Sequence, residues 1–414
     1  MQKMICIEIP DETAFPLADG APSRMARLRE LVAAGAVSRW MKPLPSEVTE
    51  RLENELTFIE RLSSNPRLDF ASYFLIVRDC VEAVRRTGAF AGPWRGAASG
   101  SAVAYALGIT DVDPVRNGLF FERFVGQNRT ALPPVWIDFD IEGCETASRY
   151  IAANYHECGL ETPNRIIFEP CALRTLSVLR ECLKRIKERT GDSIDIGCIP
   201  EDDKKTLSVF IKCDTSDIFQ FKSNDVMKWL HDARPSCFTD VMAIGTLFYN
   251  PKLAMQCPAI ARRKNGEEAV VYDHPLMESV LNETYGMPVY QEQIMALSKK
   301  LADFSRDESD ALRYAMGKKM FDDSMRLKIK FISGCIANPA FRIGEWRNET
   351  AAKLLCEKIW SDWWSVASYA FNKSHAVAYT RLAWQQAYLK THYPREHAKA
   401  VGFWYSVDMD NNRG

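Results

Sequence analysis

Apolar residues recur at helical spacing through most of the chain. After Pro45 they stand three or four residues apart, which predicts an amphipathic helix with Ser46 as its N-cap. The apolar positions of this helix are Val48, Leu52, Leu56, Ile59 and Leu62. The same spacing predicts helices over residues 24–40, 72–86, 165–190, 223–231, 275–284, 290–302, 307–316, 321–335, 350–368 and 376–391.

Other segments do not follow the helical period. Residues 135–141, VWIDFDI, alternate apolar and polar side chains as a half-buried strand does. Residues 1–22 contain prolines and acids and are interpreted as a tail or linker. Many helical segments beside this strand indicate an α+β fold that is mostly helical.

Composition and charge exclude several classes of protein. Hydrophobic residues make up 47% of 414 residues, too many for a disordered chain. With 53 basic and 54 acidic residues the net charge is −1, so a basic-tail mode of nucleic-acid binding is excluded for the chain as a whole. No apolar stretch approaches bilayer length, which predicts no membrane partner. The 12 cysteines form no C-x-x-C pair, so a zinc ribbon is not expected.

Two aspartates in the predicted strand are candidate metal ligands. Asp138 and Asp140 are two residues apart, so a strand projects both carboxylates to one face, and Glu142 extends the row. Crowded carboxylates need a compensating cation, and Mg²⁺ prefers such oxygen ligands together with substrate phosphates. The alternative is an exposed strand face whose acids are solvated.

A stretch rich in small residues, GPWRGAASGS at 92–101, is a candidate phosphate-binding loop. Small residues let backbone N–H groups approach an anion, and a helix that follows adds a favourable dipole. Arg95 can pair with a phosphate through two hydrogen bonds. The alternative is a tight helix contact, which also favours Gly, Ala and Ser.

Two segments of the C-terminal half place cations beside aromatic or small residues. Residues 363–395 contain no Asp or Glu and combine Lys373 and Arg381 with many aromatic residues, a composition that suits phosphate contacts and base stacking. Lys318 and Lys319 follow Gly317 at the end of a predicted helix. The alternatives are a buried amphipathic helix for the first segment and helix-dipole stabilisation for the second.

Several multi-residue blocks, in a fixed order, resemble the bacterial family C replicative DNA polymerases, the alpha subunit of the third polymerase holoenzyme. The resemblance covers about residues 24–411, almost the whole chain. The blocks are GPWRGAASGS with AVAYALGITDVDP, then LFFERF at 119–124, PSCFTD at 235–240, YQEQIM at 290–295, residues 313–319, and YAFNKSHAVAY at 369–379.

The resemblance implies a polymerase-beta-like nucleotidyltransferase palm with a helical thumb and large helical fingers. It also implies roles for particular residues. The implied magnesium ligands, which would hold two catalytic ions, are Asp138, Asp140 and Asp240. The implied nucleotide-binding residues are Arg95, Gly96, Ser99, Gly100, Ser101, Lys318, Lys319, Lys373 and His375. The implied DNA-binding residues are Arg174, Arg180, Lys184, Arg185 and Arg381.

The same resemblance implies a domain order and a set of partners. The expected domains are an N-terminal tail and linker helix at 1–45, palm at 46–162 and 214–250, thumb at 163–213, and fingers at 251–414. Partners would be primer-template DNA, a dNTP and, in trans, a sliding clamp or other replisome proteins. We expect the family's PHP and C-terminal domains to be missing. We therefore expect a minimal core in the bacterial cytoplasm, encoded by a phage, plasmid or mobile element.

The metal motif departs from the family pattern P-D-x-D-x-D-F. An ungapped match puts Pro134 and Trp136 where the first two aspartates belong and Asp138 in third place. A shifted match restores a D-x-D pair at Asp138 and Asp140 but needs an insertion and a compensating deletion. Both registers stay open from sequence.

Three functions follow from these alternatives. The first is a DNA-directed DNA polymerase that adds dNMP to a primer 3′-hydroxyl through a two-metal mechanism and releases pyrophosphate. The second is a catalytically degenerate homologue that binds primer-template DNA or a replisome partner. The third is a nucleotidyltransferase with a relaxed need for template.

Overall fold

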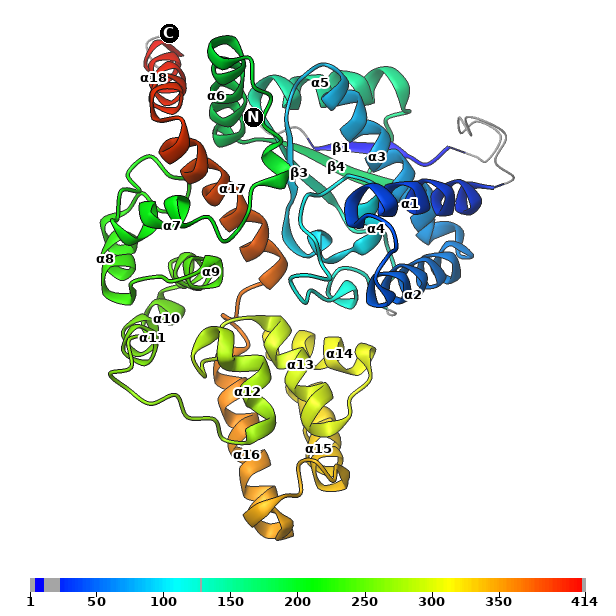
Figure 1. Ribbon diagram of the computed structural model, residues 1–414. Helices are drawn as coiled ribbons and strands as arrows, with labels where there is room; N and C mark the ends of the chain where they lie inside the picture. The colour runs from blue at the N-terminus through cyan, green and yellow to red at the C-terminus, as the bar shows by residue number, and fades with distance from the viewer. Residues whose placement is uncertain (1–3, 11–22, 127–128, 412–414) are drawn as a thin grey trace. The chain divides into compact units, whose positions relative to one another are not determined.

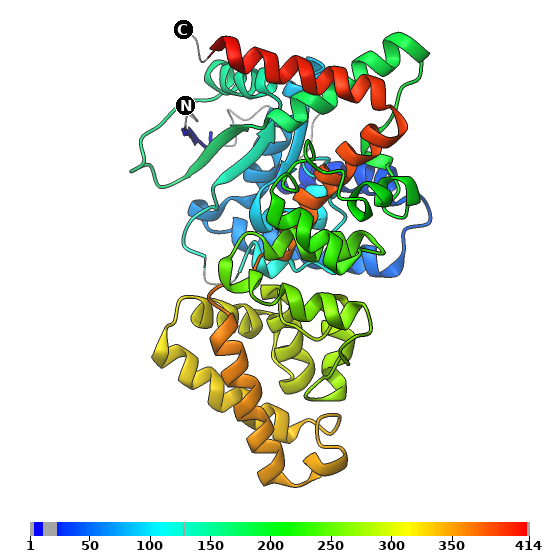
Figure 2. The same cartoon turned by 90° about the vertical axis from the view of Figure 1, so that its left-hand side faces the viewer.

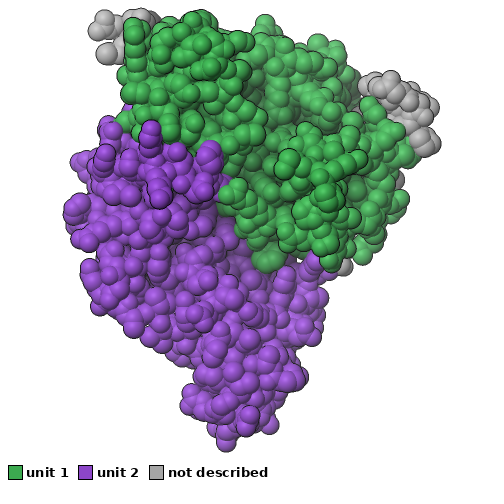
Figure 3. Space-filling view, viewed as in Figure 1, with its two compact units in different colours: residues 1–199, 377–414 green, residues 200–376 purple. Residues whose placement is uncertain are grey.

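The computed structural model describes residues 4–10, 23–126 and 129–411. The chain divides into two compact units, shown in two colours in Figure 3. Unit 1 comprises residues 1–199 and 377–414, and unit 2 comprises residues 200–376. Each unit is described by itself.

Unit 1 is built on a four-stranded mixed sheet (Figure 1). Its strands are β1 (Ile5–Glu8), β2 (Ala91–Trp94), β3 (Val135–Phe139) and β4 (Arg165–Ala172). The order across the sheet is β1-β4-β3-β2, and only the central β3–β4 pair is parallel. In that pair Asp138 lies opposite Cys171.

Helices complete unit 1. They are α1 (Arg24–Trp40), α2 (Ser46–Ser63), α3 (Phe70–Arg86), α4 (Ala102–Ala106), α5 (Ile141–Asn154), α6 (Arg174–Thr190), the part of α17 (Lys373–His392) from residue 377 onward, and α18 (Pro394–Asn411). The apolar face of α3 packs into the same core as β2 and β3, with Tyr73, Phe74 and Trp94 buried in aromatic contact. Helix α18 packs along α6, as Figure 2 shows at its upper edge.

Unit 2 is helical throughout its described secondary structure. Its helices are α7 (Lys204–Ile211), α8 (Asn224–Ala233), α9 (Phe238–Leu247), α10 (Pro251–Ala254), α11 (Cys257–Lys264), α12 (Pro275–Leu281), α13 (Gln291–Ala302), α14 (Arg306–Gly317), α15 (Phe321–Ala337) and α16 (Glu349–Val366). A second core joins α13, α15 and α16 around Phe331 and Trp363. Short 3₁₀ turns lie within unit 1 at 66–68, 96–100, 121–123 and 196–198, and within unit 2 at 282–284 and 344–347.

The fold confirms the expectation of an α+β, mostly helical protein, and it corrects three details. Residues 5–8 were expected to lie in a tail but form β1, because Ile5 and Ile7 bury their side chains and pair with β4. The expected helix over 165–190 begins only at Arg174, since 165–172 alternate buried and half-buried residues in β4. Pro45, not Ser46, caps α2. Residues 11–22 of the expected tail lie outside the described residues.

Candidate functional site

Asp138 lies on β3 and is fully buried, and both of its carboxylate oxygens have partners in unit 1. Arg95, just after β2, donates from Nε and Nη2 to Asp138 Oδ1 at 2.8 and 2.6 Å. The Tyr379 hydroxyl, on α17, donates to Asp138 Oδ2 at 3.0 Å. The arginine therefore supplies the positive charge that this buried carboxylate requires.

Burial dominates the electrostatics of this pair. Burial raises the pKa of Asp138, and the bonds from Arg95 and Tyr379 offset only part of that rise. Burial also disfavours the charged form of Arg95, but the bonds to Asp138 raise its pKa above the ordinary value overall. The two pKa shifts show that Asp138 and Arg95 are both desolvated and that each stabilises the charged form of the other.

Asp140 is also buried, but it acts at a different place. It is the N-cap of α5, and its Oδ1 accepts the Gly143 N–H at 2.7 Å. Its Oδ2 accepts a hydrogen bond from Arg180 of α6, and the same guanidinium binds Glu142. Asp140 thus stabilises the first turn of α5 and ties α5 to α6.

Trp136 stands two residues before Asp138 on β3, the strand spacing that places side chains on one face. Its side chain is 41% exposed, whereas Asp138 is fully buried. Its carbonyl accepts the Arg95 N–H at 2.8 Å, which fixes Arg95 beside the strand. In the ungapped register, this indole and Pro134 occupy the positions of the family's first two aspartates.

These contacts do not fit the predicted pair of magnesium ions at Asp138 and Asp140. Mg²⁺ needs oxygen lone pairs that face an ion in near-octahedral geometry, whereas each aspartate here directs its oxygens at an arginine and a second donor. Among the described residues, no three His, Cys, Asp or Glu side chains are grouped so that they could hold a metal ion.

At the end of the loop at 92–101, the Glu55 carboxylate occupies the place where a bound phosphate was expected. Ser101 caps the short helix α4, and Glu55 of α2 accepts the Ser101 hydroxyl at 2.8 Å and the N–H groups of Ala102 and Val103 at 2.9 and 3.1 Å. Arg51 completes the charge balance of Glu55 at 2.6 Å. The backbone donors predicted to cradle a phosphate at this helix end are therefore already used.

The other residues of this loop are mainly structural. Gly96 has φ +71°, a left-handed conformation that glycine adopts without strain. It begins the 3₁₀ turn that ends at Gly100, whose carbonyl accepts a hydrogen bond from Arg51 at 2.8 Å. The Ser99 hydroxyl donates to the Trp94 carbonyl at 2.7 Å. Arg95 keeps 30% of its side chain exposed beside this turn.

Asp240 belongs to unit 2, in the first turn of α9, where it is 3% exposed. Tyr285 donates to its Oδ1 at 2.7 Å, and Ser236 donates to its Oδ2 from both N–H and hydroxyl at 2.7 Å. Lys264 Nζ lies 3.5 Å from Oδ2. Burial opposes ionisation, but these donors outweigh it and lower the pKa of Asp240, so the carboxylate is charged.

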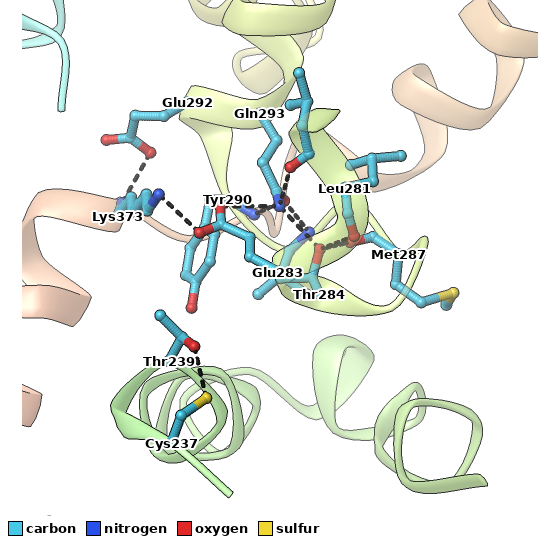
Figure 4. A network of polar contacts seen from close by, with 12 residues as sticks. Cys237, Thr239, Leu281, Glu283, Thr284, Met287, Tyr290, Glu292, Gln293 and Lys373 are labelled. Carbon is cyan, nitrogen blue, oxygen red and sulfur yellow. Dashed lines mark hydrogen bonds and ion pairs between the residues drawn. The ribbon is translucent and has the colours of Figure 1, made fainter. Parts of the chain in front are cut away.

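The cations predicted in the fingers also have partners within unit 2. Lys373 Nζ binds Glu283 at 2.9 Å, and its N–H donates to Glu292 at 2.8 Å, as Figure 4 shows. Lys319 contacts the Trp364 carbonyl and stands 4.3 Å from the centre of the Trp364 ring.

Lys318 and His375 occupy helix ends in unit 2. Lys318 is the exposed C-cap of α14. The His375 N–H donates to Asn372 Oδ1 at 2.8 Å, and its ring packs against Phe371 with centroids 5.6 Å apart. These contacts account for local structure, so the nucleotide-binding roles of both residues stay predictions.

The predicted DNA-binding residues lie mostly on α6. Arg174 is exposed at its first position, and Lys184 is exposed with Glu188 4.0 Å away. Arg185 pairs with Glu181 at 2.6 Å, while Arg180 is held by Asp140 as described. Arg381 of α17 donates to the Gly197 carbonyl. The DNA-binding roles of these residues stay predictions.

Sequence reasoning missed three side chains that determine these sites. Glu55 carried a signal, because it lies on the apolar stripe of its helix between Leu52 and Ile59, where a solvated acid does not belong. Tyr379 and Lys264 carried none. Each meets an aspartate more than twenty residues away, so only the fold brings them together.

Comparison with known proteins agrees with the fold. The NTPase domain of the bacterial DNA polymerase III alpha subunit matches residues 26–196, and the finger domain of that subunit matches residues 175–339. The DNA polymerase III subunit alpha of Halalkalibacterium halodurans is 29% identical over 90% of this chain and 42% of that protein. Those of Aquifex aeolicus and Bacillus subtilis are each 28% identical over 89% and 92% of this chain.

The two family models lie in this order over residues 26–339 and describe domains of one bacterial polymerase subunit. The chain belongs to the bacterial DNA polymerase III alpha subunit family. It spans just over two fifths of the length of the curated relatives it matches, 42% and 43% for the first two. In the part of the chain that the structure describes, no helix is both long and apolar enough to cross a membrane.

Proposed function

We propose that this chain binds primer-template DNA in replication as a homologue of the polymerase alpha subunit that does not itself extend the primer through Asp138 and Asp140. Family membership supports the DNA partner. The arrangement of the two aspartates supports the loss of extension. Other replisome proteins, such as a sliding clamp, would act in trans on the same primer-template.

One observation carries the proposal: both oxygens of Asp138 are engaged by Arg95 and Tyr379. A metal ligand must exchange such donors for an ion, and here the exchange would leave the partly exposed Arg95 guanidinium without its counter-charge. Removing one partner of a buried ion pair costs about 3–5 kcal/mol. An ion would have to supply that free energy before it could act in phosphoryl transfer.

The exposed cations of α6 make a DNA-binding test possible. Lys184 and Lys187 are both exposed on this helix. Reversing both charges, Lys184→Glu/Lys187→Glu, should weaken binding to a fluorescent primer-template by at least about tenfold and flatten the salt dependence by about two units of slope. The matched control Lys42→Glu changes an exposed lysine of the same unit and should leave the affinity within about threefold.

The proposal fails if primer-template binding is absent. It fails equally if the α6 and Lys42 variants lose affinity to the same extent, because a general charge effect would then explain the binding. Anisotropy titrations at 50–200 mM salt, roughly the range over which phosphate contacts are most visible, separate these results.

The second candidate is a DNA-directed DNA polymerase with two magnesium ions. Family membership favours it, because both matching domain models are domains of the DNA polymerase III alpha subunit. This candidate requires Arg95 and Arg180 to release Asp138 and Asp140 when substrates bind. Primer extension distinguishes it from the first.

A further inference from the structure

Unit 2 contains a cavity between α15 and α16 that no step above uses. It has a volume of about 320 Å³ and is lined from both helices. The lining residues are Phe321, Ser324, Met325, Lys328, Glu357, Trp360, Ser361 and Trp364. On each helix they stand three or four residues apart, so one face of α15 meets one face of α16 across the cavity.

The walls are aromatic and partly open to solvent. Phe321 is 67% exposed and Met325 is 40% exposed, whereas Trp360 is buried. Trp364 is half-buried and carries the Lys319 ammonium over its ring. Flat apolar walls that stay accessible suit a flat ring that stacks between them.

A buried hydroxyl in the cavity has no partner of its own. Ser324 is 2% exposed, and among the described residues its Oγ makes no hydrogen bond. A buried hydroxyl without a hydrogen bond costs about 1–3 kcal/mol, so a ligand that bonds to it gains by satisfying it. Nearby, the ion pair of Lys328 with Glu357 offers both a donor and an acceptor.

The charges around the cavity indicate the kind of ligand. Lys319 is exposed and contacts the wall residue Trp364, so a cation borders the aromatic walls. Asp322 and Asp323 lie one and two residues beyond Phe321, off the helix face that lines the cavity, and Asp323 is paired with Arg326. A nucleotide combines features that fit this cavity. Its aromatic ring can stack on the walls, the polar atoms at the ring edge can bond to the Ser324 hydroxyl, and its phosphate can contact a lysine.

We propose that this cavity binds an unpaired nucleobase of single-stranded DNA, with Phe321 and Trp364 as stacking walls, Ser324 bonding to the base edge and Lys319 near the backbone phosphate. The proposal relies on the proposed function only for the choice of DNA as polymer. It concerns a site distinct from α6, so the two can fail separately.

The test measures the affinity of the full chain for a fluorescent single-stranded oligothymidylate. Phe321→Ala should weaken binding between about fivefold and a hundredfold, the range for loss of one stacking contact. Ser324→Ala should weaken it by a smaller factor, about two- to fivefold. Ile329→Ala is the matched control, since Ile329 is on the same helix, 68% exposed and outside the cavity, and it should change affinity less than twofold.

A second probe separates the base from the backbone. With an abasic oligonucleotide of the same length, Phe321→Ala and wild type should bind equally. Equal affinity of Phe321→Ala and wild type for oligothymidylate would overturn the inference, as would an equal loss with the abasic probe. If the α6 variant loses duplex binding but Phe321→Ala does not lose oligothymidylate binding, this inference is wrong and the proposed function still stands.

Discussion

At the scale of single residues, the central feature is that Asp138 is neutralised by Arg95. The pair joins the end of β2 to β3, and Tyr379 adds a third contact. Such a pair contributes little net stability compared with apolar residues of the same size, but breaking it leaves an unpaired charge inside the fold. The interaction between Asp138 and Arg95 can therefore be measured by comparing the removal of one partner with the removal of both.

Single and double substitutions of this pair should not be additive. Asp138→Asn and Arg95→Met should each lower the free energy of unfolding by about 2–3 kcal/mol, less than a fully buried pair because Arg95 is partly exposed. The double variant should lose about 1–2 kcal/mol less than the sum, since it leaves no lone charge.

Urea denaturation gives the three values, and the surface pair Glu349 and Lys353 provides the control. That pair is more than half exposed, so its coupling should stay below about 0.5 kcal/mol. If Asp138→Asn instead stabilises the protein, the cost of burying the Asp138 charge exceeds what Arg95 and Tyr379 return, and the account of this pair is wrong.

Asp240 should make stability depend on pH in the acid range. Its folded pKa is below the ordinary 3.8, so its contribution is complete above that value and is lost as pH falls through the folded pKa. The difference in unfolding free energy between wild type and Asp240→Asn should therefore be larger at pH 6 than near pH 3, by about 1 kcal/mol. Asp202→Asn, an exposed substitution in the same unit, should show nearly the same small difference at both pH values.

The candidate site was only partly predictable from residues. The sequence identified Asp138 as a candidate metal ligand, but periodicity could not choose between the two registers of the metal motif. The choice depends on what each carboxylate touches. Arg95 was predicted to bind phosphate because its neighbours are small, and it binds Asp138 because β2 and β3 are adjacent strands, which no local pattern states.

At the scale of elements, α4 is held by two contacts that differ in kind. Glu55 caps its first turn from α2, and Gly35 of α1 passes so close that a Cβ there would lie 1.9 Å from the Ala106 carbonyl oxygen. Helix α4 has only five residues, so it cannot be stable without these neighbours.

Glu55→Gln should destabilise unit 1 strongly. The substitution removes the charge that Arg51 balances and at least one acceptor for the α4 N–H groups, with an expected loss of about 2–4 kcal/mol. Glu53→Gln on the same helix, 62% exposed, should cost less than about 0.5 kcal/mol. A similar small effect of both, measured by chemical denaturation, would show that Glu55 does not hold α4.

Two glycine-to-alanine substitutions should have opposite signs. Alanine favours a helix over glycine by about 1 kcal/mol, so Gly402→Ala, with open space around it in α18, should raise the melting temperature slightly. Gly35→Ala should lower it, because the clash with Ala106 outweighs the helix preference by about 1–3 kcal/mol. Scanning calorimetry distinguishes them, and an increase for Gly35→Ala would contradict the close packing of α1 on α4.

Most helices could be predicted, whereas the sheet largely could not. The helices from α12 to α16 follow the apolar spacing closely, because each buries one face in a local core. Strand β1 has only four residues, and the eight residues of β4 were expected to be helical. The pairing of these strands joins residues 5–8 to residues 165–168, far apart in the sequence. The basic residues of α6 also extended the expected helix backward over β4.

At the scale of the whole molecule, the chain forms two compact units. Residues 377–414 pack with unit 1 in sequence-distant contacts such as those between α18 and α6, although they were expected to belong to the fingers. A single helix, α17, continues from unit 2 into unit 1. The assignment of palm, thumb and fingers to these units stays a prediction.

Primer extension tests the central claim most directly. The same fluorescent primer-template is first shown to be bound, and then dNTPs are added with Mg²⁺ or Mn²⁺ to wild type, to Asp138→Asn and to Asp240→Asn. We predict that wild type binds the DNA but yields no more extended primer than the two variants. Extension by wild type that Asp138→Asn abolishes, with DNA binding unchanged, would contradict the account and identify the chain as an active polymerase.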